Sequence, residues 1–246
     1  MSVLSGRRAL VTGGSRGIGA AIVRRLAADG AMVGFTYAAS GGSADKLRAE
    51  VAAQGGTAVA IQADSADAQQ VTVAVDEAVA ALGGLDILVN NAGMSTSGIA
   101  ESFPLQDFDR MLAVNVRGVF VAIQRAIPHL GTGGRVVTIG SIFADRVPRA
   151  GTAVYAMTKA ALAGLTRGLA RELGPRGITV NVIQPGPTAT DANPDSGEFA
   201  DTMRQLTAVG HYGRPEDIAS AVAYLVSPEA GFITGTTWNV DGGFAV

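Results

Sequence analysis

Residues 12–19 read Thr12-Gly13-Gly14-Ser15-Arg16-Gly17-Ile18-Gly19. This glycine-rich turn follows a short apolar run at 9–11, which is typical of a buried strand, and precedes helical spacing of apolar residues over 18–29. Glycines let the backbone turn tightly, and the free N–H groups at the start of the helix attract an anion. The stretch predicts a phosphate-binding strand–turn–helix unit, although a tight turn without a ligand would use the same residues.

The same alternation of strand and helix continues along the chain. Further strands are expected at 31–37, 58–62, 85–89, 135–139, 178–183 and 236–240, and further helices at 44–54, 66–82, 105–126, 153–173 and from 215. This order predicts a parallel sheet covered on both faces. Seven strands and an early phosphate motif favour an open sheet over an eightfold barrel. We therefore expect an α/β protein: one Rossmann-type domain over 1–246 with a doubly wound seven-stranded sheet and one long insertion, 188–210.

Composition excludes several classes of protein. The 246 residues include no Cys, two His, and 19 basic against 21 acidic side chains, for a net charge of −2. Without Cys there are no disulfides, thiolate metal centres or thiol nucleophiles, and we expect no metal site. The charge balance argues against a nucleic-acid partner, and the longest charge-free run, 30–44, is too short and polar to span a membrane. The N-terminus lacks a signal-peptide pattern, so we expect a cytoplasmic protein.

Three other residues have the chemistry for proton transfer. Tyr155 and Lys159 are four residues apart in a helical segment, so they lie on one face, one turn apart. A free phenol has a pKa of about 10, and a neighbouring ammonium lowers it, although such a pair is also common on helix surfaces. Ser141 follows the strand 135–139, at the sheet edge where doubly wound folds bind ligands.

Together these patterns resemble the short-chain dehydrogenase/reductase family over nearly the whole chain. The matching segments are Thr12-Gly13-x-x-x-Gly17-x-Gly19, Asn90-Asn91-Ala92-Gly93, Asn115, Ser141, Tyr155-x-x-x-Lys159 and Pro185-Gly186. The resemblance implies an NAD(P)-dependent oxidoreductase acting on a carbonyl or alcohol. It implies that Tyr155 is the general acid or base and that Ser141 stabilises the reacting oxygen. It further implies that Lys159 lowers the pKa of Tyr155 and holds the nicotinamide ribose, and that Asn115 holds a water. Asn91 and Asn115 could instead be core amides whose hydrogen bonds are made within the protein.

The resemblance also implies where the dinucleotide lies. The expected contacts are Gly13, Ser15, Arg16, Gly17, Ile18, Gly19, Tyr37, Ala38, Ser40, Ala63, Asp64, Ser65, Asn91, Ala92, Gly93, Tyr155, Lys159, Pro185, Gly186, Thr188 and Thr190. Asp64 and Ser65 would contact the adenine, cap the helix that starts at 66, or do both. No acid ends the second strand, where NAD-preferring members carry one, and Arg16 is suited to a 2′-phosphate. We expect NADP(H), with NAD(H) as the alternative.

The substrate remains open at this stage. Residues 138–141 and 175–181 resemble the 3-oxoacyl-(acyl-carrier-protein) reductases, with Arg176 at a carrier-protein position, but 128–134 lacks the basic cluster frequent there. This favours a small ketone or aldehyde over a 3-oxoacyl thioester. Residues 35–38, 64–67 and 184–194 also resemble biofilm-dispersal proteins of this fold that bind cyclic di-GMP, so a nucleotide-binding regulator is the alternative function.

Two further expectations concern the insertion and assembly. Residues 188–210 are expected to cover the substrate, with Met203, Leu206 and Val209 either lining an apolar pocket or anchoring a short helix. Because relatives assemble through their helices and last strand, the resemblance implies a homotetramer or homodimer.

Overall fold

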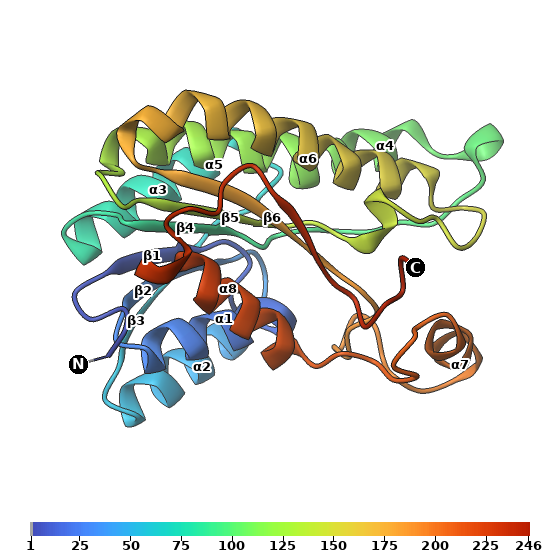
Figure 1. Ribbon diagram of the computed structural model, residues 1–246, viewed down its shortest axis with the longest axis horizontal. Helices are drawn as coiled ribbons and strands as arrows, with labels where there is room; N and C mark the ends of the chain where they lie inside the picture. Colours follow the sequence, from blue (N-terminus) through green and yellow to red (C-terminus); the bar gives the residue numbers. More distant parts are fainter. Residues whose placement is uncertain (1) are drawn as a thin grey trace.

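Seven parallel strands form the centre of the computed structural model, which describes residues 2–246 (Figure 1). They are β1 (Arg8–Val11), β2 (Met32–Tyr37), β3 (Thr57–Gln62), β4 (Ile87–Asn90), β5 (Arg135–Ile139), β6 (Thr179–Pro185) and β7 (Thr237–Val240). Their order in the sheet is β3-β2-β1-β4-β5-β6-β7. The order reverses between β1 and β4, which opens a ligand-binding crevice at the carboxyl ends of these strands. The predicted seven-stranded, doubly wound sheet is confirmed.

Helices cover both faces of the sheet (Figure 1). One face carries α1 (Gly17–Ala28), α2 (Gly41–Ala53) and α8 (Pro215–Val226), and the other carries α3 (Ala68–Leu82), α4 (Leu105–Leu112), α5 (Gly118–Ala126) and α6 (Ala153–Leu173). The predicted helix over 105–126 is a continuous helical path, but a π-turn at Ala113–Arg117 separates α4 from α5. Such turns are frequent at functional sites.

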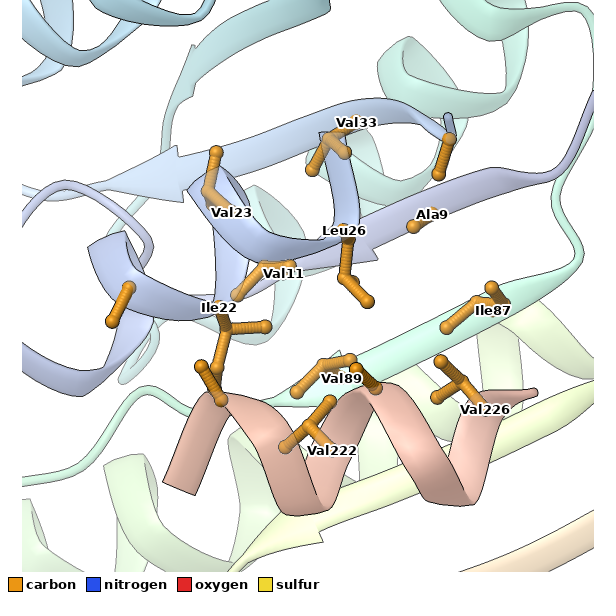
Figure 2. Packing of buried hydrophobic residues seen from close by; sticks show 14 of the residues in the cluster. Ala9, Val11, Ile22, Val23, Leu26, Val33, Ile87, Val89, Val222 and Val226 are labelled. Carbon is orange, nitrogen blue, oxygen red and sulfur yellow. The ribbon is translucent and has the colours of Figure 1, made fainter. Parts of the chain in front are cut away.

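The packing of α1 against α8 fixes the glycine-rich turn at the sheet edge. Ile22 and Leu26 of α1 meet Val222 and Val226 of α8 over the β-strands (Figure 2). These four side chains are almost completely buried. Burial of one such side chain contributes about 1.5–3 kcal/mol, so this seam holds the start of α1 firmly in place.

The helical stretch Leu105–His129 is long and apolar enough to cross a membrane by length and mean hydropathy alone. Half of its most apolar part is buried inside the protein. Val119, Ala122 and Ile123 pack there with residues of α3 and β4, as in the core helix of any layered α/β fold.

The insertion 188–210 is less irregular than the sequence predicts. It contains a short helix, α7 (Glu198–Gln205), which projects from the end of the sheet (Figure 1). Met203 is buried in a small cluster with Ile142, Tyr212 and Phe244, whereas Val209 is exposed. Of the two roles considered for these residues, Met203 takes the anchoring one.

Candidate active site

The glycine-rich turn is held in shape by its neighbours in the sheet. Gly13 N donates a hydrogen bond to Thr36 Oγ1 (2.9 Å), and Gly14 N donates to the Thr36 carbonyl (2.8 Å). A β-carbon on Gly19 would lie 2.3 Å from the Gly13 carbonyl oxygen. The third glycine of the motif is therefore required by the close packing of the turn on itself, before any ligand is considered.

Thr12 and Asn91 join the ends of β1 and β4 beneath this turn. Thr12 Oγ1 accepts hydrogen bonds from the backbone N–H groups of Asn91 (3.0 Å) and Ala92 (3.1 Å). In return, Asn91 Nδ2 donates to the carbonyls of Thr12 (3.0 Å) and Gly13 (2.9 Å). The amide of Asn91 is thus turned into the protein, and Ala92 packs against Gly13. Of the two roles considered for Asn91, these bonds are those of a satisfied core amide, and they link residues far apart in the chain.

The start of α1 has the features of an anion site. Arg16 precedes the helix in an extended conformation, and no side chain caps its first N–H groups. The Arg16 side chain is exposed and makes no hydrogen bond or ion pair within residues 2–246. Ser40 likewise precedes α2 without a side-chain capping bond, beside the half-buried Tyr37 and the exposed Ala38. Uncapped N–H groups, an available guanidinium and no carboxylate at the end of β2 fit a phosphorylated dinucleotide.

The loop after β3 is more constrained than the sequence predicts. Ala63 is buried, and its N–H donates to the Tyr37 carbonyl (2.9 Å). Although partial burial alone would raise it, hydrogen bonds from the Ala66 N–H and from Arg110 hold the pKa of Asp64 below its usual value. The expectation that Asp64 or Ser65 caps the next helix is wrong. Asp67 caps α3 instead, by accepting from the backbone N–H groups of residues 69 and 70.

Ser141, Tyr155 and Lys159 meet at the carboxyl edge of β5. Ser141 precedes the short helix η4 (Ile142–Ala144), and its Oγ accepts from Phe143 N (3.2 Å). Lys159 Nζ lies 5.8 Å from the centre of the Tyr155 ring and donates to the Ile139 carbonyl (3.0 Å). A serine after β5 and two residues on one face of α6 are therefore brought together, as the sequence predicts.

Burial sets the proton affinities of this group. Burial raises the pKa of the Tyr155 phenol, although a hydrogen bond with Ser141 acts in the opposite direction. This direction is the reverse of the lowering that the sequence predicts from the nearby ammonium. Burial also lowers the pKa of Lys159 to about 8. At neutral pH the phenol is thus protonated, and the ammonium beside it is close to releasing its own proton.

Asn115 lies in the π-turn and is fully engaged. Its Oδ1 accepts from Met94 N (2.9 Å), and its Nδ2 donates to the Met94 carbonyl (2.9 Å) and to Thr158 Oγ1 (3.0 Å). Thr158 Oγ1 in turn donates to the Tyr155 carbonyl (2.8 Å). The side chain of Asn115 therefore connects the π-turn, the irregular segment after Gly93 and α6.

The end of β6 and the insertion lie against the glycine-rich turn. Thr188 Oγ1 donates to the Gly186 carbonyl (3.0 Å), and a β-carbon on Gly17 would lie 3.4 Å from Thr190 Cγ2. Pro185 is buried at the end of β6. A β-carbon on Gly186 would lie 2.6 Å from Asp241 Cα. Only a glycine at this position therefore leaves room for the chain segment after β7. The structure therefore brings the predicted contacts of β6 and α1 to the same crevice.

Aromatic side chains lie beside Tyr155, and sequence reasoning missed them. The Phe143 ring meets the Tyr155 ring edge-on, with centres 6.0 Å apart. It also stacks on Phe244, with centres 6.4 Å apart, and Arg146 lies over the Phe244 ring. The wall next to the phenol is therefore apolar and aromatic, which suits the carbon skeleton of a carbonyl compound.

Comparison with known proteins identifies a matching family and several relatives of this chain. The family model described as enoyl-(acyl carrier protein) reductase matches residues 13–245. The chain is 47% identical over 244 residues to the cyclic-di-GMP-binding biofilm dispersal mediator protein of Escherichia coli K12, covering 99% of both chains. It is 40% identical over 240 residues to a 3-oxoacyl-(acyl-carrier-protein) reductase of Staphylococcus aureus, covering 96% of this chain and 97% of the relative.

Solved structures agree with these sequence matches. A short-chain dehydrogenase/reductase from Serratia marcescens is 59% identical, with a TM-score of 0.98 over 99% of both chains. A short-chain dehydrogenase from Burkholderia cenocepacia, crystallised in complex with NADP, is 55% identical, with a TM-score of 0.97 over 99% of both chains. The matches extend over almost every residue, from the glycine-rich turn to the last strand, and the chain belongs to the short-chain dehydrogenase/reductase family.

Proposed function

We propose that the protein is an NADPH-dependent carbonyl reductase that also runs in reverse as an alcohol dehydrogenase. The observation that carries this proposal is the meeting of Ser141, Tyr155 and Lys159 at the sheet edge, next to a crevice built for a dinucleotide. The reduced nicotinamide, when bound, supplies the hydride. Tyr155 and its neighbours must then donate one proton to the substrate oxygen and stabilise the negative charge that develops on it.

In the reduction, Tyr155 donates its proton to the carbonyl oxygen of the substrate. Its raised pKa keeps the phenol protonated at neutral pH, as a general acid requires. Ser141 donates a hydrogen bond to the same oxygen and stabilises the charge that develops there. Lys159 stabilises the phenolate left behind and, with a pKa of about 8, returns a proton to it. The amine of Lys159 would then take up a proton from solvent through a water that Asn115 holds, while the Asn115 side chain keeps the π-turn and α6 in place.

The cofactor would lie along the crevice from β2 to β6. Gly13, Ser15, Gly17, Ile18 and Gly19 would hold the pyrophosphate, and Arg16, Tyr37, Ala38 and Ser40 the 2′-phosphate. Ala63, Asp64 and Ser65 would contact the adenine. Asn91, Ala92, Gly93, Pro185, Gly186, Thr188 and Thr190 would contact the nicotinamide half, together with Tyr155 and Lys159. The uncapped start of α1, the available Arg16 and the NADP bound in the related Burkholderia enzyme support NADP(H) over NAD(H).

The substrate class that best fits the site is a small apolar ketone or aldehyde. Phe143 places an aromatic ring beside the phenol and stacks on the buried Phe244. Arg176, the residue at a carrier-protein position, donates to the carbonyls of Ile127 and Leu130 (2.9 Å each) and is occupied within its own chain. This favours a free carbonyl compound over the 3-oxoacyl thioester that the Staphylococcus relative is named for.

A regulator that binds cyclic di-GMP is the second candidate. The Escherichia coli relative, named for that ligand, supports it. The complete catalytic group favours the enzyme, because a nucleotide sensor needs no serine, tyrosine and lysine arranged for proton transfer.

We further propose a cytoplasmic homo-oligomer, a tetramer or a dimer. The proposal rests on the resemblance to relatives that assemble through their helices and last strand, and Phe120 is exposed on α5.

The test is loss of NADPH absorbance with a panel of ketones, aldehydes and 3-oxoacyl thioesters, run beside a cyclic di-GMP titration. The proposal predicts turnover of at least one free carbonyl compound. Binding of cyclic di-GMP without any turnover would replace it with the regulator. Turnover of thioesters alone would change the substrate class.

A further inference from the structure

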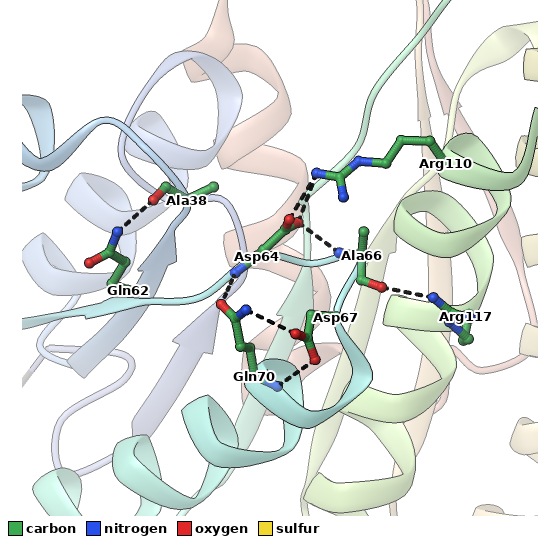
Figure 3. A network of polar contacts seen from close by, with 8 residues as sticks. All are labelled: Ala38, Gln62, Asp64, Ala66, Asp67, Gln70, Arg110 and Arg117. Carbon is green, nitrogen blue, oxygen red and sulfur yellow. Dashed lines mark hydrogen bonds and ion pairs between the residues drawn. The ribbon is translucent and has the colours of Figure 1, made fainter. Parts of the chain in front are cut away.

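The loop between β3 and α3 is held from outside by the segment α4–α5, which is distant in sequence (Figure 3). Arg110 Nη2 donates to both carboxylate oxygens of Asp64, at 3.1 and 2.9 Å. Arg117 Nη2 donates to the Ala66 carbonyl (2.8 Å). Gly118 packs so close that a β-carbon there would lie 2.2 Å from the Ser65 carbonyl oxygen. Three consecutive residues of the loop are thus fixed by three residues of one helical segment.

From the inside, the same loop is joined to the end of β2 and to α3. The Ala63 N–H donates to the Tyr37 carbonyl (2.9 Å). Asp64 N donates to Gln70 Oε1 (3.0 Å), and Asp64 Oδ1 accepts from the Ala66 N–H (2.9 Å). The loop is therefore held in a defined conformation between the crevice and α4–α5. Arg110 is the cation that pairs with the Asp64 carboxylate of this loop.

We propose that Arg110 and, to a smaller extent, Arg117 are positioning residues for the adenine end of the cofactor. Neither is assigned a contact with the dinucleotide. Arg110 fixes the loop and neutralises Asp64, whose carboxylate would otherwise repel an anionic ligand at the neighbouring crevice. This inference rests on the proposed function, in which the adenine lies on residues 63–65.

The test is a fluorescence titration of the full-length protein with NADPH. Arg110→Ala is expected to raise the Kd about tenfold, because a charge-assisted hydrogen bond and the order of the loop are both lost. Its kcat at saturating NADPH is expected to stay within about twofold, since the loop is remote from the reacting atoms. Arg110→Lys is expected to restore most of the affinity, because a single nitrogen of Arg110 makes both contacts with Asp64. Arg117→Ala, which loses one bond to a carbonyl, is expected to raise the Kd less.

Arg125→Ala is the matched control. Arg125 pairs with Asp76 of α3 through Nε (2.6 Å) and Nη2 (2.9 Å), with an exposure close to that of the Arg110–Asp64 pair, and does not touch the loop. Both alanine variants should show the same small change in Tm.

Three outcomes would overturn the inference. Equal NADPH Kd values for Arg110→Ala and Arg125→Ala would show that the loop does not depend on Arg110. A fall in kcat with an unchanged NADPH Kd would show that Arg110 affects turnover and not cofactor binding. A wild-type protein that does not bind NADPH would remove the proposed function first, and this inference with it.

Discussion

The dinucleotide side of the crevice, between β1 and β4, and the substrate side, between η4 and α7, are held in different ways. On the dinucleotide side, the turn is fixed by short polar bonds from Thr12, Thr36 and Asn91, and glycines pack without room for a β-carbon. On the substrate side, Phe143, Met203 and Phe244 meet through apolar contacts. Directional bonds define one geometry, whereas apolar contacts tolerate exchange of similar side chains.

From this difference we expect that cofactor affinity and substrate preference can be changed independently. Changes on the dinucleotide side should alter cofactor affinity and leave substrate preference intact. Changes on the substrate side should do the reverse. Tyr155 lies where the two sides meet, so removal of its hydroxyl should affect the chemistry without moving either binding constant far.

The largest effect is expected from Tyr155→Phe, which removes the proton donor at the boundary of the two sides. We expect kcat to fall by about 10²–10⁴-fold, the range of general acid–base catalysis. The NADPH Kd should stay within about twofold, because the ring and its contact with Phe143 are kept. Steady-state kinetics and a fluorescence titration measure the two quantities. An unchanged kcat would remove Tyr155 from the mechanism.

The second prediction concerns the stability cost of the buried ammonium at the same boundary. The pKa of Lys159 is about 8 in the folded protein and 10.5 for an unperturbed lysine. Below pH 8 the group is charged in both states, and only the folded state carries the burial cost. Between pH 8 and 10.5 the folded protein releases this proton first, so the free energy of unfolding rises with pH.

Lys159→Met should therefore stabilise the protein at pH 7 by about 2 kcal/mol while abolishing turnover, after allowance for the bond lost at the Ile139 carbonyl. Its advantage over the wild type should shrink above pH 8. Urea denaturation of both proteins across this range measures the difference. A wild type more stable than the variant at neutral pH would contradict the account.

The third prediction sharpens the dinucleotide side. Arg16→Ala should raise the Kd for NADPH about 10–100-fold, the value of a charge-assisted phosphate contact, and leave the Kd for NADH within about twofold. Substrate preference should not change. Arg48→Ala, which removes an exposed arginine of α2, is the control. Equal losses for both cofactors would mean that Arg16 acts on the turn and not on a 2′-phosphate.

The smallest effect is expected on the substrate side. Phe143→Leu keeps an apolar side chain but removes the ring that meets Tyr155 and Phe244. We expect KM for aromatic carbonyl substrates to rise about threefold relative to aliphatic ones, the scale of a lost aromatic contact. The NADPH Kd should not move. A change in cofactor affinity without a change in substrate preference would break the division between the two sides.

What the sequence predicts well depends on short-range spacing. The glycine-rich turn, the Tyr155–Lys159 pair and Ser141 after β5 are all defined by residues that lie close together in the chain. Parallel topology then brings their elements to one edge of the sheet. The strand and helix order follows for the same reason, since each apolar run is local.

What the sequence does not predict depends on partners far along the chain. The Thr12–Asn91, Arg110–Asp64 and Phe143–Phe244 contacts appear only once the sheet is assembled. The direction of the Tyr155 pKa shift is wrong from sequence because burial, which has no local pattern, raises the pKa more than the hydrogen bond with Ser141 lowers it. The cap of α3 is Asp67 because the helix begins at Ala68, two residues later than the start that the sequence predicts.

The central claim is that this protein moves a hydride from NADPH to a carbonyl carbon, with Tyr155 as the proton donor. The most direct measurement uses NADPH carrying deuterium at the transferable position and follows the alcohol product by mass spectrometry and NMR. The account predicts one deuterium on the carbinol carbon, and a much slower appearance of the same labelled product with Tyr155→Phe. A product without deuterium on that carbon, or equal rates for the two proteins, would contradict it.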